Sequence, residues 1–270
     1  DGRVRPFDQK ASGTNFGDSV GAVVLKRLED AEKAGDHVWA VIEGFGTSND
    51  GKQKAGYSAP SARGQRFAIL DAQRMAGVSS DQISYVECHA TATNIGDGIE
   101  LSGLSEAFRM NAGTDAPQTD GRHCALGSVK GNIGHANCAA GITGLIKTIL
   151  CLEHQRLCPT VHFKEVSSKL RLDTPGTPFF VHEALKPWKL QEQHGEVRRA
   201  GVSSFGIGGT NCHMVLREYQ NQPNRDVHAT TTRETMTSHL LTFSAKTSSA
   251  LMLGLERMAR FLKEYDETAH

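Results

Sequence analysis

Apolar residues along the chain follow two different spacings, and each spacing predicts its own kind of element. Ile83 to Cys88 is apolar at alternate positions and rich in β-branched and aromatic residues, which predicts a strand. Ala22 to Leu25 is a continuous apolar run, which predicts a buried strand. Further strands are predicted over 38–45, 124–129, 179–181, 200–204, 212–216 and 239–246.

Helical spacing appears between these segments, and small or polar residues mark the predicted helix ends. A helix is predicted over 61–76, with Gly77 just beyond its end. Asp97 is expected to cap a helix that continues to about Arg109. Further helices are predicted over 26–34, 139–152 and 248–265.

The segment 139–152 has an unusual distribution of charge for a helix. Lys147 is its only charged residue before Glu153. A helix that is apolar nearly all round is buried on several sides, and Gly141 and Gly144 would permit close packing against neighbours. The sequence therefore predicts a central helix here.

Three loops carry the candidate chemistry. His89 follows the 83–88 strand directly, and ligands bind at the carboxyl ends of strands in an open α/β sheet. Lys130 and His135 lie around a glycine turn at a helix start, and 205–209 is a glycine-rich loop between two apolar runs. A histidine at such a position can move a proton or donate a hydrogen bond, whereas the structural alternative is a buried ring that satisfies a backbone group.

Composition narrows the class of protein. The chain has 270 residues, and its 30 lysines and arginines balance its 30 aspartates and glutamates, so nothing favours a nucleic-acid partner or an anionic membrane surface. No apolar run reaches the roughly 18 residues of a membrane span. The six cysteines lack paired ligand spacing, which predicts reduced thiols, a cytoplasmic location and no bound metal.

The loop motifs resemble those of one family when they are taken together. The stretches 86–100, 127–141 and 201–213, with Asp1-Gly2-Arg3-Val4-Arg5-Pro6-Phe7-Asp8 ahead of them, resemble the C-terminal half of a β-ketoacyl synthase (ketosynthase) domain of a type I polyketide synthase, in the thiolase superfamily. The resemblance covers about 1–218. It implies an α/β chain that forms the C-terminal half of a thiolase-like layered αβαβα fold.

The remaining sequence implies further parts of a larger protein. Residues 219–239 are polar and aperiodic, which predicts a flexible linker. Residues 240–270 look like the start of the linker domain that joins a ketosynthase to an acyltransferase, with an apolar helix face left poorly covered. The implied partners are the N-terminal ketosynthase half, an acyl carrier protein, a downstream acyltransferase domain and a second copy in a homodimer.

The resemblance also assigns chemistry to the loops. A ketosynthase condenses an acyl thioester with a malonyl-type extender on acyl carrier protein by decarboxylative Claisen condensation. The resemblance implies that His89 and His135 donate hydrogen bonds to the enolate. It also implies that Lys130 positions and polarises the His89 region. Ile207, with Gly206 at the pocket mouth, would supply an oxyanion-hole N–H group.

The resemblance implies one carrier group, the phosphopantetheine arm, which arrives with the substrate. No cofactor is expected to bind directly, and the phosphopantetheine arm of the carrier protein delivers the substrate. Thr91 and Thr93 would hydrogen-bond this arm, whereas the structural alternative is that they only cap the loop.

The sequence departs from the family pattern at important positions. The family's nucleophilic cysteine, within a small-residue turn, is absent, and none of the six cysteines has that context. Ala90 and Ala92 replace the commoner glycines, and Gly98 replaces the usual proline. The chain alone is therefore expected to be inactive.

Two other function classes remain open. One is a non-catalytic carrier-binding module or a malonyl decarboxylase remnant, since the nucleophile is missing. The other is an α/β protein that binds a dinucleotide through the 205–209 loop, although this loop lacks the following helix and acidic residue of that fingerprint.

Overall fold

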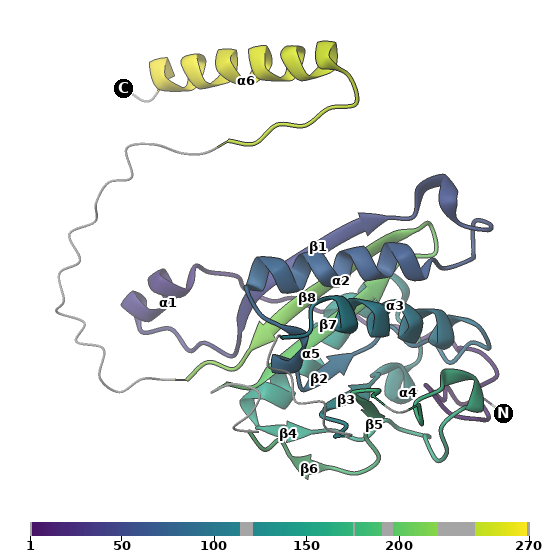
Figure 1. Ribbon diagram of the computed structural model, residues 1–270. Coiled ribbons are helices and arrows are strands. Elements are labelled where there is room, and N and C mark those ends of the chain that lie inside the picture. The colour runs from purple at the N-terminus through teal and green to yellow at the C-terminus, as the bar shows by residue number, and fades with distance from the viewer. Residues whose placement is uncertain (1, 114–120, 175, 191–196, 221–240, 269–270) are drawn as a thin grey trace. The chain divides into compact units, whose positions relative to one another are not determined.

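The computed structural model divides the chain into two compact units, Asp1–Gln222 and Pro223–His270. Figure 1 shows both units. The structure describes residues 2–113, 121–174, 176–190, 197–220 and 241–268.

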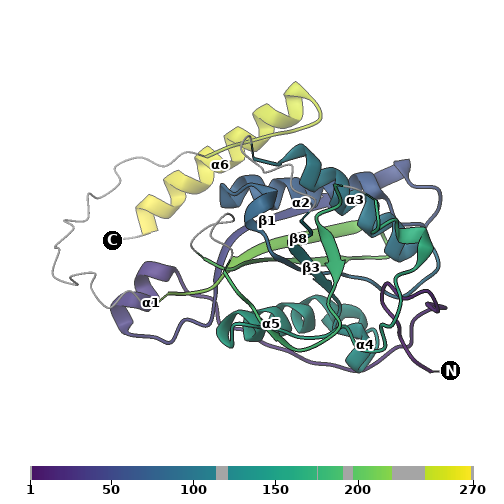
Figure 2. The same ribbon diagram turned by 60° about the horizontal axis from the view of Figure 1, so that its bottom comes forward.

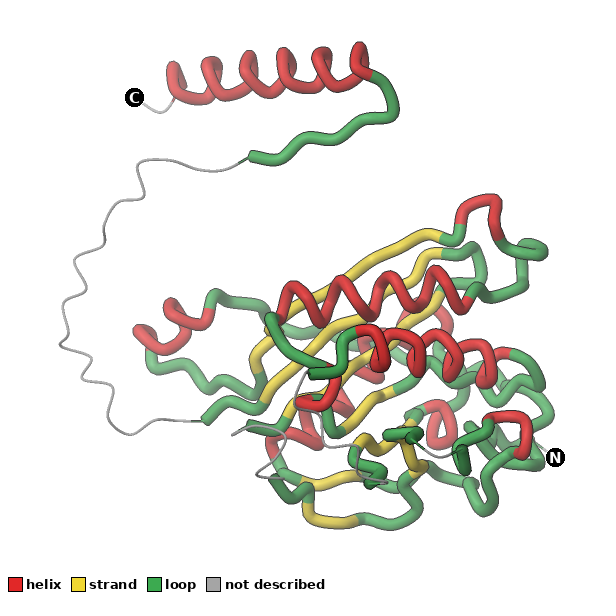
Figure 3. Tube along the Cα trace, viewed as in Figure 1, coloured by secondary structure: helices red, strands yellow, loops and turns green. Residues whose placement is uncertain are grey.

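A six-stranded mixed sheet forms the centre of the first unit, in the order β1-β8-β7-β2-β3-β5 (Figure 3). The four strands β7, β2, β3 and β5 run parallel, whereas β8 is antiparallel to both β1 and β7. The short strands β4 and β6 pair separately. The strands are β1 (Val41–Asn49), β2 (Tyr85–Glu87), β3 (Cys124–Gly127), β4 (Arg156–Leu157), β5 (Phe179–Val181), β6 (Lys186–Pro187), β7 (Arg199–Phe205) and β8 (Thr210–Arg217).

Helices cover both faces of this sheet, as Figure 2 shows, with α2 and α3 on one side and α5 on the other. Val86 faces a core with Ile69 of α2 and Leu104 of α3. Tyr85 faces a second core with Leu145 of α5. The helices are α1 (Leu28–Ala34), α2 (Ala62–Ala76), α3 (Gly96–Met110), α4 (Lys130–Ile133) and α5 (Ala140–Glu153), with single 3-10 turns at Gly51–Gln53, Ser80–Gln82, Asn137–Ala139 and Ser168–Leu170.

The predicted ends of α2 are confirmed. The Ser61 side chain accepts a hydrogen bond from the Gly64 N–H group, and Gly77 follows the helix with φ +67°, a left-handed conformation that suits glycine. Strand β1 runs close beneath this helix, because a Cβ atom on Gly46 would lie 2.1 Å from the Ala68 carbonyl oxygen.

The predicted strand at Ala22–Leu25 is wrong. This segment belongs to no strand, and Val24 and Leu25 are 98% and 73% exposed. A continuous apolar run is buried only where a neighbouring strand or helix covers it, and the described part of the chain pairs no strand with this one. Gly21 contacts Ile142 of α5 at one end of the run.

Two other details differ from the sequence prediction. Asp97 does not cap α3 but lies in its first turn, where its carboxylate accepts a hydrogen bond of 2.9 Å from the Phe7 N–H group. Helix α5 has one buried side rather than several, because Leu150 is 41% exposed.

The second unit contains the predicted helix. Helix α6 (Ser248–Thr268) has apolar side chains that are exposed. The predicted strand over 239–246 is not formed at 241–246, and its first two residues lie outside the described part. The predicted linker lies outside it as well, apart from 219–220. The exposed apolar residues of α6 include Met252, Leu253, Leu255, Phe261 and Leu262.

Candidate active site

The candidate residues gather where parallel strands end. His89 follows β2, Lys130 opens α4 just after β3, and Phe205 ends β7. Since β7, β2 and β3 are neighbours in parallel register, their carboxyl ends form one edge of the sheet. The predicted position of His89 just beyond the carboxyl end of a strand is therefore confirmed, and the structure places Lys130 at the same edge.

His89 and His135 lie side by side in the structure. Their ring centroids are 5.2 Å apart, and the ring planes meet at 82°. The Phe205 ring lies 5.9 Å from His89, and the Phe16 ring lies 6.2 Å from His135. Both histidines are partly buried.

Hydrogen bonds to the backbone determine which nitrogen of each ring carries the proton. The Phe205 N–H group donates to His89 Nδ1 at 3.4 Å, and the Asn137 N–H group donates to His135 Nδ1 at 3.1 Å. Because a backbone N–H group only donates, Nδ1 is the acceptor in each neutral ring. Each neutral imidazole therefore carries its proton on Nε2.

The surroundings favour the neutral form of both rings. Burial, followed by the charge of Lys130, lowers the pKa of His89 well below its usual value. The same two causes lower the pKa of His135. Burial also lowers the pKa of Lys130, which is 3% exposed, while Glu87 and Glu100 act in the opposite direction. The two rings are therefore neutral hydrogen-bond donors at neutral pH.

Two buried glutamates support these loops, and the sequence analysis missed both of them. Glu100 accepts hydrogen bonds from the N–H groups of His89 and Ala90, each at 2.7 Å. Burial raises the pKa of Glu100 to about 7. The glutamate sits on the buried side of α3, and this helical position among apolar residues was the available signal.

Glu87 connects the strand before His89 to the segment before Lys130. Its carboxylate accepts hydrogen bonds from the Val129 N–H group at 2.6 Å and the Tyr85 hydroxyl at 2.5 Å. It also forms an ion pair of 2.7 Å with Lys147 of α5. An acidic residue inside a short apolar strand was the sequence signal for this role.

The glycine-rich loop is the tight turn between β7 and β8. The Gly206 N–H group is engaged by the Thr210 carbonyl oxygen at 2.7 Å, so it is not open to a substrate. Ile207 is 64% exposed, and its carbonyl oxygen accepts a hydrogen bond of 2.7 Å from Lys54. Among the described residues, the Ile207 N–H group has no hydrogen-bond partner. A turn between antiparallel strands lacks the following helix of a dinucleotide fingerprint, which argues against that alternative.

The two threonines contact each other. Their Oγ1 atoms lie 3.2 Å apart, and Thr93 Oγ1 accepts a hydrogen bond of 3.1 Å from the Gly96 N–H group. Thr93 thus has the capping role that the sequence left open, whereas Thr91 remains partly exposed. Their contact with a pantetheine arm stays a prediction.

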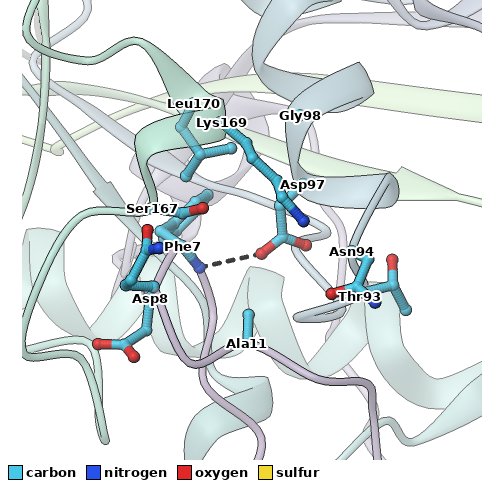
Figure 4. A pocket seen from close by; sticks show the side chains of 11 residues that line it. Phe7, Asp8, Ala11, Thr93, Asn94, Asp97, Gly98, Ser167, Lys169 and Leu170 are labelled. Atoms are coloured by element: carbon cyan, nitrogen blue, oxygen red, sulfur yellow. Dashed lines mark hydrogen bonds between the residues drawn. The ribbon is translucent and has the colours of Figure 1, made fainter.

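A separate pocket is lined in part by Thr93 (Figure 4). The residues that line it come from three segments, around Asp8, Asp97 and Leu170. Burial raises the pKa of Asp97 to about 6, while backbone hydrogen bonds, including that from Phe7, act to lower it. Neither histidine of the pair lines this pocket.

The described residues form neither a metal cluster nor a membrane-spanning helix. Within the described ranges, no group of three or more histidine, cysteine, aspartate and glutamate side chains is arranged to hold a metal ion. No helix among the described residues has the length and apolar character needed to cross a membrane. All six cysteines are free, and Cys88 lies in the core beneath α2 and α3.

Comparison with protein families assigns three parts of the chain. Residues 39–164 match the β-ketoacyl synthase C-terminal domain, 177–270 match the ketoacyl-synthetase C-terminal extension, and 1–31 match the β-ketoacyl synthase N-terminal domain. The C-terminal match agrees with the resemblance of the motifs, whereas 1–31 match the N-terminal domain and not the C-terminal half that the sequence predicted for them.

Relatives and solved structures agree with this assignment. One of the subunits that make up the phenolphthiocerol/phthiocerol polyketide synthase of Mycobacterium tuberculosis is 45% identical over 98% of the chain, and polyketide synthase PksL of Bacillus subtilis is 40% identical over 99%. The ketosynthase from module 6 of the bacillaene synthase of Bacillus subtilis is 39% identical, with a TM-score of 0.74 over 98% of the chain. The ketosynthase from module 1 of the bacillaene synthase of Bacillus amyloliquefaciens is 40% identical, with the same TM-score over 82%.

The chain belongs to the β-ketoacyl synthase family and forms the C-terminal part of a ketosynthase domain of the polyketide synthase type. Its fold is accordingly the C-terminal part of a thiolase-like α/β domain. The chain spans 17% and 6% of the length of the two polyketide synthases and 43% and 39% of the two solved ketosynthase chains.

Proposed function

We propose that this chain supplies one half of the active site of a ketosynthase, which condenses an acyl thioester with a malonyl-type extender on acyl carrier protein. The observation that carries the proposal is the pair of neutral imidazoles, His89 and His135, whose ring centroids are 5.2 Å apart. Each presents an Nε2–H group, and two such donors suit the oxygen of a thioester enolate. The enolate forms when the malonyl group loses carbon dioxide.

Other residues have supporting roles in this proposal. Burial, together with the charge of Lys130, keeps both imidazoles neutral, and Lys130 polarises the His89 region. The Ile207 N–H group stabilises the tetrahedral oxyanion during carbon–carbon bond formation. Gly206 shapes the turn rather than donating, because its N–H group is engaged within the loop. Thr91 and Thr93 hydrogen-bond the pantetheine arm, Thr93 in addition to its capping role.

The nucleophile comes from a part of the domain that this chain lacks. We propose that a cysteine in an N-terminal ketosynthase half holds the growing acyl chain and that the present chain alone does not condense. The exposed apolar segment 20–25 supports this view, because a neighbouring half would cover it. No directly bound cofactor is part of the proposal.

The proposal includes an organisation for the larger protein. Residues 1–218 belong to the ketosynthase, 219–239 form a linker, and 240–270 begin the domain between ketosynthase and acyltransferase. The partners are the N-terminal half, the acyl carrier protein, the downstream acyltransferase domain and a second copy in a homodimer. The location is the cytoplasm.

The test joins this chain to an N-terminal β-ketoacyl synthase domain that carries the cysteine. With an acyl thioester and malonyl-carrier protein, we expect carbon dioxide release and a β-ketoacyl product from the joined protein, and neither from the chain alone. His135→Ala should abolish both, whereas His154→Ala, at an exposed helix end, should leave them unchanged. A folded, joined protein that gives no condensation would overturn the proposal.

A second candidate is a carrier-binding module or a malonyl decarboxylase remnant. It is favoured by the fact that none of the six cysteines lies in a small-residue nucleophile turn. Carbon dioxide release without product formation in the joined protein would select decarboxylation. Binding of carrier protein with neither reaction would select the module.

A further inference from the structure

Two cysteines that the condensing chemistry does not use lie beside each other. Cys151 is in the last turn of α5, and the chain reverses at His154 and Gln155 before β4 brings Cys158 back. The two Sγ atoms are 3.8 Å apart, and both thiols are free. A disulfide requires about 2.05 Å between the sulfurs, so the two Sγ atoms would have to approach each other further.

We propose that Cys151 and Cys158 form an intramolecular disulfide when the chain meets a low-molecular-weight disulfide such as oxidised glutathione. The pair closes a loop of only a few residues and therefore competes well with any second molecule. This modification is independent of the proposed condensing function.

The two thiols have different surroundings, and these determine the order of the steps. Cys151 is 2% exposed and packs in the core with Leu152 and Trp188, whereas Cys158 is partly exposed. Burial, followed by the neighbouring Cys158, raises the pKa of the Cys151 thiol to about 12. Cys158 is therefore the thiol that meets an external disulfide, and Cys151 is the thiol that resolves the product.

The exchange balances in two steps. Cys158 loses its proton and attacks one sulfur of oxidised glutathione, which releases one molecule of reduced glutathione. Cys151 then loses its proton and attacks the Cys158 sulfur of the mixed disulfide, which releases the second. Two protein thiols are oxidised to one disulfide, and one glutathione disulfide is reduced to two thiols.

The crosslink would act on an element that supports the candidate active site. Cys151 lies four residues after Lys147 on α5, so both side chains project from the same side of the helix. Lys147 holds Glu87 through their ion pair. The disulfide therefore ties the end of α5 to the returning segment just beyond this contact.

The test uses the whole chain and peptide mapping. The chain is incubated with oxidised glutathione and then unfolded, so that all remaining thiols, buried ones included, are alkylated. It is digested with trypsin without reduction. Because Arg156 lies between the two cysteines, cleavage after Lys147, Arg156 and Lys164 separates them unless they are crosslinked. We expect peptides 148–156 and 157–164 to appear joined as the main oxidised product, and to separate on reduction.

Variants test the order of the steps. Cys151→Ser should leave glutathione attached to Cys158, whereas Cys158→Ser should leave Cys151 alkylated and free of glutathione. Cys138, an exposed thiol on a different segment, serves as the internal control and should carry glutathione only.

Three results would overturn the proposal, and all of them are measured on the chain without substitutions. They are a stable glutathione adduct on Cys158, alkylation of both thiols while Cys138 is oxidised, or a crosslink to another chain. None of these results tests condensation, so a failure of this proposal leaves the proposed function unaffected.

Discussion

The ion pair between Lys147 and Glu87 can be tested by its contribution to the free energy of unfolding. The two charged groups are 2.7 Å apart, and their side chains are only 14% and 2% exposed. The perturbation is Lys147→Met, which keeps the unbranched apolar stem and removes the charge. Glu87 then remains buried with only the Tyr85 hydroxyl and the Val129 N–H group as partners.

The expected cost follows from the distance and the burial. Unit charges at 2.7 Å attract by about 6 kcal/mol at an effective dielectric constant of about 20, and the desolvation of both groups offsets part of this attraction. Removal of one partner from a buried pair costs about 3–5 kcal/mol, because the other charge stays buried. We therefore expect Lys147→Met to lower the free energy of unfolding by about 3–5 kcal/mol.

The reverse change should cost less. Glu87→Gln leaves Lys147 near the surface, where its flexible stem lets the ammonium group reach water. The glutamine carbonyl can still accept from the Val129 N–H group, so the loss is close to that of one hydrogen bond to a charged group, about 1.5–3 kcal/mol. The double variant should lose less than the sum of the two single variants.

Urea unfolding of the chain, followed by circular dichroism, measures all three variants. Arg74→Met is the matched control, because the Arg74 and Asp71 side chains are 65% and 54% exposed and such pairs contribute about 0–1 kcal/mol. Equal losses for Lys147→Met and Arg74→Met, or a strictly additive double variant, would refute the argument that this pair is a buried, coupled contact.

Three further predictions concern the same unit. Burial raises the pKa of Glu100 from 4.5 to about 7, so the stability that its protonation contributes is fully present below pH 4.5 and is lost as the pH rises through about 7; Glu100→Gln should flatten the decline in unfolding free energy between pH 5 and 7. Gly46→Ala should destabilise by about 1–3 kcal/mol because its Cβ would meet the α2 backbone, whereas Gly208→Ala, in open space, should be neutral in thermal unfolding. Lys130→Met should raise the pKa of both site imidazoles in an NMR titration, and an unchanged pKa would remove Lys130 from the argument.

Local signals predicted the features that depend on local physics. The ends of α2 follow from a serine that accepts a backbone hydrogen bond and a glycine that adopts a left-handed conformation. The position of His89 follows from the rule that ligands bind beyond the carboxyl ends of the strands in an open α/β sheet. Each inference needed only a few neighbouring residues.

Features that depend on distant segments were not accessible in this way. Asp97 looks like a helix cap, but its carboxylate binds the Phe7 N–H group, 90 residues away in sequence. Apolar character predicted burial for Ala22–Leu25, but burial requires a partner, and local sequence does not reveal whether one is present. Glu87 was overlooked because an acidic residue in a strand usually marks a solvent-facing position, whereas helices cover both faces here.

The electrostatics of the site form a connected sequence rather than separate contacts. Glu87 and Glu100 oppose the effect of burial on the Lys130 pKa and so favour its charged form. Burial lowers the pKa of both imidazoles, and the charge of Lys130 adds to this effect. Backbone N–H groups at Nδ1 then leave the proton of each ring on Nε2. All of these groups lie within this chain. Residues of this chain alone therefore set the protonation of both rings, and the proposed N-terminal half would have to supply only the proposed nucleophile.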